Sequence, residues 1–83
     1  MVDVDVNETP VSDDESLLIV DDEVNLRLQL AKAMDRRGFQ ADVAESVADG
    51  IRAVEARPPK YAVIDLRLDD GSGLEVVETL RRV

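Results

Sequence analysis

Three short apolar segments interrupt an otherwise mixed sequence, and each has the pattern of a β-strand. Residues 17–20 are four consecutive large aliphatic residues, too few for a helix and suited to a strand covered on both faces. Residues 61–66 are nearly all apolar apart from Asp65. In residues 39–43 apolar and polar positions alternate, which is the period of a half-buried strand. We therefore predict one strand in each segment.

Each predicted strand is followed by apolar residues at helical spacing. We expect a first helix over residues 23–37 that stops at Gly38, because glycine readily adopts the backbone conformation that ends a helix. Ser46 has the position of an N-cap for the second helix, which should end before Pro58. A third helix follows a loop at residues 67–73. The expected buried faces consist of Leu26, Leu30, Ala33 and Met34, then Val47, Ile51 and Val54, and finally Leu74, Val77 and Leu80.

This threefold alternation of strand and helix predicts an α/β fold with a parallel sheet and right-handed crossovers. The strand order 2-1-3 would place the first and third strands side by side. In such sheets ligands bind beyond the carboxyl ends of the strands, at the point where the strand order switches. We therefore expect a binding site at that end of the sheet.

Acidic residues stand at this end of both neighbouring strands. Asp21 and Asp22 follow the first strand, and Asp65 lies near the end of the third. Carboxylates that converge cannot all stay ionised without a cation among them, so we predict a divalent-metal site with one carboxylate available for chemistry. Mg²⁺ prefers oxygen ligands, which suggests Asp22 and Asp65 as direct ligands, Asp21 through water and the backbone carbonyl of Arg67. A carboxylate on such a metal can attack phosphorus and form an acyl phosphate.

Simpler roles for these residues are also open. An aspartate after a strand often forms a turn or caps the next helix, which applies to Asp22 and Asp65. Asp69 and Asp70 are expected to be loop residues. Residues 71–73 are a weak match to a phosphate-binding loop, because no lysine follows them. If the acidic residues only cap helices or solvate a surface, the chain is an interaction module.

The charge of the chain is unevenly distributed. Residues 1–16 carry −6 of the formal net charge of −9, since they contain six acidic residues and no basic one. Such a segment buries too little apolar surface to offset its ordering entropy, so we expect a flexible acidic tail at 1–16 and a domain at 17–83. Cysteine is absent, and no apolar stretch approaches the roughly 20 residues of a membrane span. We expect a cytoplasmic protein that does not contact membranes, and the lack of a basic cluster argues against direct nucleic-acid binding by this segment.

Two stretches together resemble the receiver domain of two-component response regulators. They are Leu-Leu-Ile-Val-Asp-Asp-Glu at 17–23 and the segment from Ala-Val-Ile-Asp to Gly-Leu-Glu-Val-Val at 62–77. A closer similarity, to the RegA/PrrA/ActR group of redox-responsive regulators, lies in Arg-Gly-Phe at 37–39, Ala-Glu-Ser-Val-Ala at 44–48 and the loop at 65–74. The resemblance covers residues 17 to 83.

The resemblance implies a flavodoxin-like (βα)5 fold and a role for each site residue. Asp65 matches the phospho-acceptor, which takes a phosphoryl group from a histidine of a sensor kinase. Asp21 and Asp22 match the acidic pair that holds Mg²⁺, and Arg67 matches the residue that lends a backbone carbonyl. Members of the group control transcription through a C-terminal helix-turn-helix that binds DNA. They are not enzymes beyond their own phosphorylation and dephosphorylation, and a homodimer is compatible with the family.

The chain departs from the family pattern in its extent. A receiver has five strands, whereas this sequence stops within the third helix, so we expect the fold to be truncated after the third strand–helix pair. The family's Ser/Thr after the fourth strand, its Lys after the fifth and the helix-turn-helix have no counterpart here. A metal-dependent phosphohydrolase with an aspartyl nucleophile is disfavoured, because haloacid-dehalogenase-like enzymes place an Asp where this chain has Arg67.

Overall fold

The computed structural model describes residues 15–83, and its centre is a parallel sheet of three strands. The strands are β1 (Ser16–Val20), β2 (Gln40–Ala44) and β3 (Tyr61–Ile64). Their order is β2-β1-β3, so the predicted 2-1-3 order and the α/β class are confirmed. The expected tail, residues 1–16, lies outside the described residues except at its last two positions, the second of which begins β1.

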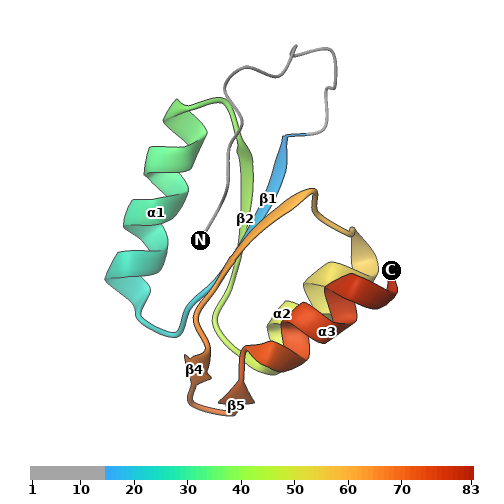
Figure 1. Cartoon of the computed structure of the whole chain (residues 1–83). Coiled ribbons are helices and arrows are strands. Elements are labelled where there is room, and N and C mark those ends of the chain that lie inside the picture. The colour runs from blue at the N-terminus through green and yellow to red at the C-terminus, as the bar shows by residue number, and fades with distance from the viewer. Residues whose placement is uncertain (1–14) are drawn as a thin grey trace.

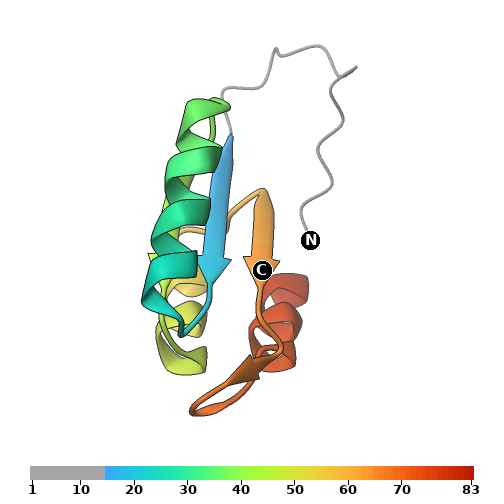
Figure 2. The same cartoon turned by 90° about the vertical axis from the view of Figure 1, so that its left-hand side faces the viewer.

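Helices cover both faces of this sheet. They are α1 (Val24–Arg36), α2 (Val47–Ala56) and α3 (Leu74–Arg82). α1 lies on one face, whereas α2 and α3 lie together on the other (Figure 1). The loop expected between β3 and α3 contains a small antiparallel hairpin of β4 (Arg67–Leu68) and β5 (Gly71–Ser72). β1 and β3 both point toward this hairpin, which therefore lies at the carboxyl end of the sheet (Figure 2).

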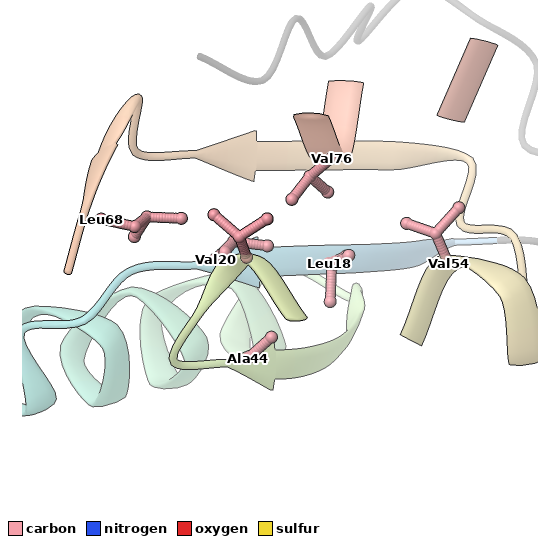
Figure 3. Close-up of a cluster of buried hydrophobic side chains, with 7 residues drawn as sticks. Leu18, Val20, Ala44, Val54, Leu68 and Val76 are labelled. Atoms are coloured by element: carbon pink, nitrogen blue, oxygen red, sulfur yellow. The ribbon is translucent and has the colours of Figure 1, made fainter. Parts of the chain in front are cut away.

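The alternation of side chains along β1 divides the core between the two faces. Leu18 and Val20 point to the face covered by α2 and α3, where they meet Val54 and Val76 (Figure 3). The intervening residues of β1 form a second cluster on the face of α1. That cluster consists of Leu17, Ile19 and Phe39, with Leu30, Ala31 and Met34 of α1 packed against it. β1 is buried on both faces, as its unbroken apolar sequence predicted.

The helix ends follow the local signals in the sequence. The N–H of Asp49 donates to Oγ of Ser46 at 3.0 Å, so Ser46 is the N-cap of α2 as predicted. Gly38 follows α1 with a positive φ of 94°, a conformation that glycine adopts at little cost. Gly50 lies inside α2, where a Cβ would stand 3.0 Å from a methyl group of Val76 and 3.3 Å from one of Val20. The absence of a side chain at this position brings α2 close to β1 and α3.

Three apolar positions that the sequence pattern placed on buried faces are exposed in the structure. Leu74, at the start of α3, was expected to be buried but is 53% exposed, and α3 buries Val76 instead. Leu26 was expected on the buried face of α1 but is 45% exposed, because the contacts of α1 with its core cluster begin one turn later, at Leu30. Val43 is 43% exposed, since it lies on the outer strand β2, and the following Ala44 is buried instead. Sequence periodicity predicted the three strands of the sheet and the three helices, but it did not predict the β4–β5 hairpin, and it overestimated the burial of these side chains.

In residues 15–83 every helix is too short or too polar to traverse a lipid bilayer.

Candidate metal centre

Three aspartates meet at the carboxyl end of β1 and β3. Asp21 and Asp22 directly follow β1, and Asp65 directly follows β3. One carboxylate oxygen from each of the three lies within 4.8 Å of the others. This convergence was predicted from the sequence, and the structure confirms it. We refer to these three residues as the acidic trio.

The sheet itself aligns the acidic trio. Val20 and Ile64 are paired across β1 and β3, so the next residue of each strand emerges at the same level. The hydrogen bonds of the sheet continue into these residues: the N–H of Asp65 donates to the carbonyl of Val20 at 2.9 Å, and the N–H of Asp21 donates to that of Ala44 at 3.1 Å. The parallel register therefore holds the two carboxylates side by side.

Asp21 is the most enclosed of the trio, with an exposed fraction of 8%. Its Oδ1 accepts a hydrogen bond from the N–H of Glu23 at 2.9 Å. Its backbone carbonyl accepts another from Nη1 of Arg27, also at 2.9 Å, so the first turns of α1 hold the loop that carries Asp21. The Asp21 carboxylate is fixed in orientation and still turned toward its two neighbours.

Asp22 does not cap α1, although its position after a strand allowed that role. Glu23 is the N-cap, and its carboxylate accepts from the N–H groups of Asn25 at 3.2 Å and Leu26 at 2.6 Å. Within residues 15–83 the carboxylate of Asp22 has no hydrogen-bond donor. Because the cap is supplied by the next residue, Asp22 is left available for a cation.

Asp65 combines the turn role with its place in the trio. Its Oδ1 accepts a hydrogen bond from the N–H of Arg67 at 3.0 Å, which closes the turn after β3. Arg67 is the exposed first residue of β4, and its backbone N–H is the group that contacts the Asp65 carboxylate. One interaction thus orients the carboxylate of Asp65 and places the Arg67 peptide beside it.

Gly73 closes the site from the side of α3, a role that the sequence reasoning missed. Its N–H donates to the carbonyl of Leu66 at 3.1 Å. A Cβ at this position would stand 2.8 Å from Cγ2 of Ile64 and closer still to the backbone oxygen of Asp65. Real Cβ atoms essentially never approach other atoms within 3.0 Å, so the start of α3 reaches the end of β3 only with glycine here.

Asp70 is a loop residue, as expected, but it also has a role that no local pattern indicates. Its Oδ1 accepts from the N–H of Val47 at 2.8 Å and its Oδ2 from the N–H of Ala48 at 3.1 Å. These donors lie 23 and 22 residues earlier in the sequence, at the start of α2. The hydrogen bonds from Val47 and then Ala48 lower the pKa of the Asp70 carboxyl from its ordinary value of 3.8.

This lowered pKa predicts a pH dependence of stability. Because the folded-state pKa lies below the unfolded one, the contribution of Asp70 is present above pH 3.8 and is lost as the pH falls through the folded-state pKa. Between about pH 5 and pH 2, the wild-type protein should therefore lose stability more steeply than Asp70→Asn. Urea unfolding of both proteins across this range measures the difference, and parallel curves for the two proteins would contradict the prediction.

The β2-β1-β3 sheet with the acidic trio at its carboxyl end defines a flavodoxin-like α/β domain with a candidate divalent-metal site. Residues 17–83 match the sequence model of the response regulator receiver domain, and the chain belongs to this family. A receiver domain of this kind is a signalling domain of two-component systems.

Relatives of the chain are regulatory proteins. The photosynthetic apparatus regulatory protein RegA of Rhodovulum sulfidophilum is 58% identical over 74 residues, covering 89% of this chain and 40% of RegA. The acid tolerance regulatory protein ActR of Rhizobium meliloti is 58% identical over 71 residues, covering 86% of this chain and 37% of ActR. The chain thus spans about two fifths of these relatives, and the expected similarity to their group is confirmed.

Solved receiver structures share the fold. The response regulator TrrA of Thermotoga maritima, solved in complex with Mg²⁺-BeF, has a TM-score of 0.75 and 28% identity, and the match covers 81% of this chain and 58% of that one. A CheY-like receiver domain of Methylobacillus flagellatus also has a TM-score of 0.75, with 35% identity over 82% of this chain and 58% of its own. These matches confirm the predicted receiver fold.

Proposed function

We propose that Asp65 of this receiver domain accepts a phosphoryl group from a phosphohistidine of a sensor kinase, with the help of Mg²⁺. The observation that carries the proposal is the acidic trio, in which oxygens from two neighbouring strands lie within 4.8 Å of one another. Phosphorylation would in turn control transcription. The DNA-binding helix-turn-helix of the proposed regulator lies outside these residues, and its proposed location is the cytoplasm.

The residues present fit a magnesium ion. Mg²⁺ takes oxygen ligands, usually from one or two carboxylates together with water and phosphate oxygens. The proposed protein ligands are the three carboxylates of Asp21, Asp22 and Asp65, with Asp21 acting through water, and the backbone carbonyl of Arg67. When bound, the ion neutralises negative charge on the incoming phosphoryl oxygens. TrrA, which has the same fold, was solved with both Mg²⁺ and BeF.

The proposed reaction is a transfer between two side chains. A carboxylate oxygen of Asp65 forms a bond to phosphorus while the bond from phosphorus to the imidazole nitrogen breaks, and the electron pair of that bond stays with the imidazole. The N–H of Arg67, which holds Oδ1 of Asp65, keeps the carboxylate from rotating away from the phosphorus. The result is an acyl phosphate on Asp65, and no net hydrolysis is required.

The metal requirement gives a direct test. In the full-length protein that contains residues 1–83, incorporation of phosphate from acetyl phosphate should depend on Mg²⁺ and stop when a chelator is added. Asp22→Asn should raise the Mg²⁺ concentration that gives half-maximal labelling by about tenfold or more, because it removes one charged ligand. Asp69→Asn is the matched control, since Asp69 is an exposed aspartate in the same region.

Two results of this experiment would count against the proposal. Labelling that proceeds equally well in the presence of chelator would exclude a metal role for the acidic trio. Absence of labelling, together with no Mg²⁺-dependent change in the amide signals of Asp22 and Asp65, would instead favour an interaction module in which these carboxylates only support the loops.

A further inference from the structure

The β4–β5 hairpin is fastened to the start of α2. Both carboxylate oxygens of Asp70 accept hydrogen bonds there, from the N–H groups of Val47 and Ala48. Leu68 of β4 is buried in the same core cluster as Val47. A Cβ on Gly71 would lie only 3.7 Å from Cγ2 of Val47, so the hairpin also approaches this residue with its backbone. The tip of the hairpin and the first turn of α2 are therefore one packed unit.

The same hairpin carries the part of the backbone that adjoins the acidic trio. Two residues, Asp69 and Asp70, join β4 to β5, and Arg67 is paired with Ser72 across the hairpin. At the start of the hairpin, the N–H of Arg67 donates to Oδ1 of Asp65. A shift of the hairpin at Asp70 must therefore displace the peptide of Arg67, because the two are separated by one short antiparallel ladder.

We propose that Asp70 is a positioning residue for the metal centre, which it supports from outside the pocket through the backbone of Arg67. The inference rests on the proposed function, in which the carbonyl of Arg67 is a metal ligand. The hydrogen bonds of the Asp70 carboxylate go to the start of α2, and none of them goes to the acidic trio. It holds the hairpin against α2, and the hairpin in turn holds the carbonyl at a fixed distance from the trio.

A capping role alone does not account for this arrangement. α2 already has a local cap in Ser46, whose Oγ accepts the N–H of Asp49 at 3.0 Å. Asp70 binds the two preceding N–H groups of the same helix end, and it is supplied by a different segment of the chain. Ser46 and Asp70 thus stabilise one helix terminus, but only Asp70 connects it to the segment that carries Arg67.

This difference provides the test. In the full-length protein that contains residues 1–83, Asp70→Ala should raise the apparent KM for Mg²⁺ in phosphorylation by acetyl phosphate about tenfold, the lower range for groups that orient metal ligands. The rate at saturating Mg²⁺ should stay near the wild-type value, because Asp65 is untouched. Asp70→Asn should show a smaller increase, about threefold, because its amide oxygen still accepts one hydrogen bond.

Two control variants separate positioning from stability. Ser46→Ala removes the other cap of α2 without touching the hairpin, and Asp69→Ala removes a neighbouring charge that has no hydrogen-bond partner in residues 15–83. Both should leave the KM for Mg²⁺ within about twofold of wild type, since neither moves Arg67. Urea unfolding of Asp70→Ala and Ser46→Ala shows whether the two variants lose comparable stability.

The inference is overturned if Asp70→Ala leaves the KM for Mg²⁺ unchanged, or if Ser46→Ala raises it equally. It is also overturned if the effect of Asp70→Ala appears only in the maximal rate. Should Asp70→Ala fail to fold, Asp70→Asn decides by the same criteria. If the wild-type protein itself shows no Mg²⁺-dependent labelling, the proposed function fails and this inference with it, whereas wild-type activity with an unaffected Asp70→Ala refutes the positioning role alone.

Discussion

Replacement of Asp65 by asparagine is expected to abolish phosphate incorporation and to leave the fold intact. An amide lacks the negatively charged oxygen that attacks phosphorus, so no acyl phosphate can form at this position. Asparagine has the same shape as aspartate, and its Oδ1 can still accept the N–H of Arg67 that closes the turn after β3. The loss should therefore be chemical and not structural.

The Asp65→Asn variant should lose phosphorylation without losing stability, and in the absence of Mg²⁺ it should be at least as stable as the wild type. Without Mg²⁺, negative charges on the acidic trio repel one another, because their oxygens lie within 4.8 Å, at a cost on the order of 1 kcal/mol for each charged pair in water. Asp65→Asn should therefore unfold at an equal or higher urea concentration than the wild type in metal-free, low-salt buffer, with a difference that shrinks as salt is added. Addition of Mg²⁺ should stabilise the wild type more than the variant.

Incorporation of labelled phosphate from acetyl phosphate, with the full-length protein, measures the first effect. Asp69→Asn is again the matched control, since it makes the same chemical change at an exposed position outside the trio. Labelling of Asp65→Asn at the wild-type level would show that Asp65 is not the acceptor. A large loss of stability in this variant would show that the carboxylate is primarily structural.

Gly73→Ala is expected to be strongly destabilising, by about 3 kcal/mol. Gly73 has helical backbone angles, φ −60° and ψ −16°, so alanine meets no conformational penalty and the whole cost is steric. The new methyl group would stand 2.8 Å from Cγ2 of Ile64 and even closer to the backbone oxygen of Asp65. A backbone atom cannot move aside without displacing Asp65, so the variant should also bind Mg²⁺ more weakly.

Gly50→Ala is the matched control for this variant. It makes the same substitution in a buried position, but its Cβ would meet only methyl groups, at 3.0 Å on Val76 and 3.3 Å on Val20. Alanine is also favoured over glycine at a helical position by up to about 1 kcal/mol, chiefly because it lowers the entropy of the unfolded chain, and this gain offsets part of the crowding. The reduced entropy of the unfolded chain favours both alanine variants equally and cancels in the comparison.

Urea unfolding should therefore place Gly50→Ala within about 1 kcal/mol of the wild type and Gly73→Ala well below both. Equal stability of the two alanine variants would mean that the start of α3 is not packed against the end of β3 as the structure shows. If a destabilised Gly73→Ala protein still bound Mg²⁺ normally, the packing of Gly73 would not be needed to keep Asp65 in position for the metal.

The elements of the fold could be read from local patterns. The unbroken apolar sequence of residues 17–20 predicted a strand buried on both faces, and β1 is such a strand because helices cover the sheet on either side. Ser46 was recognised as a cap because its partner, the N–H of Asp49, is three residues away. Signals of this kind succeed where the interacting groups are close in sequence.

The acidic trio is an intermediate case. Asp65 lies more than forty residues from Asp21 and Asp22, yet their meeting was predictable because parallel strands bring their carboxyl ends to one edge. Leu26 shows where this kind of prediction fails. Its spacing places it on the apolar face of α1, but it is exposed because the core cluster contacts only the later turns of the helix. Periodicity indicates which face of a helix is apolar, but it does not indicate over what length of the helix a neighbouring element covers that face.

The sequence by itself determined the order of strands and helices, the parallel topology and the convergence of three aspartates, because each follows from local periodicity combined with general rules of chain connection. Only the tertiary structure decided that Asp70 binds the start of α2, that Gly73 must lack a side chain and that the N-cap of α1 is Glu23 and not Asp22. These features depend on distances between segments far apart in the chain, where a difference of one ångström separates a hydrogen bond or a close contact from none.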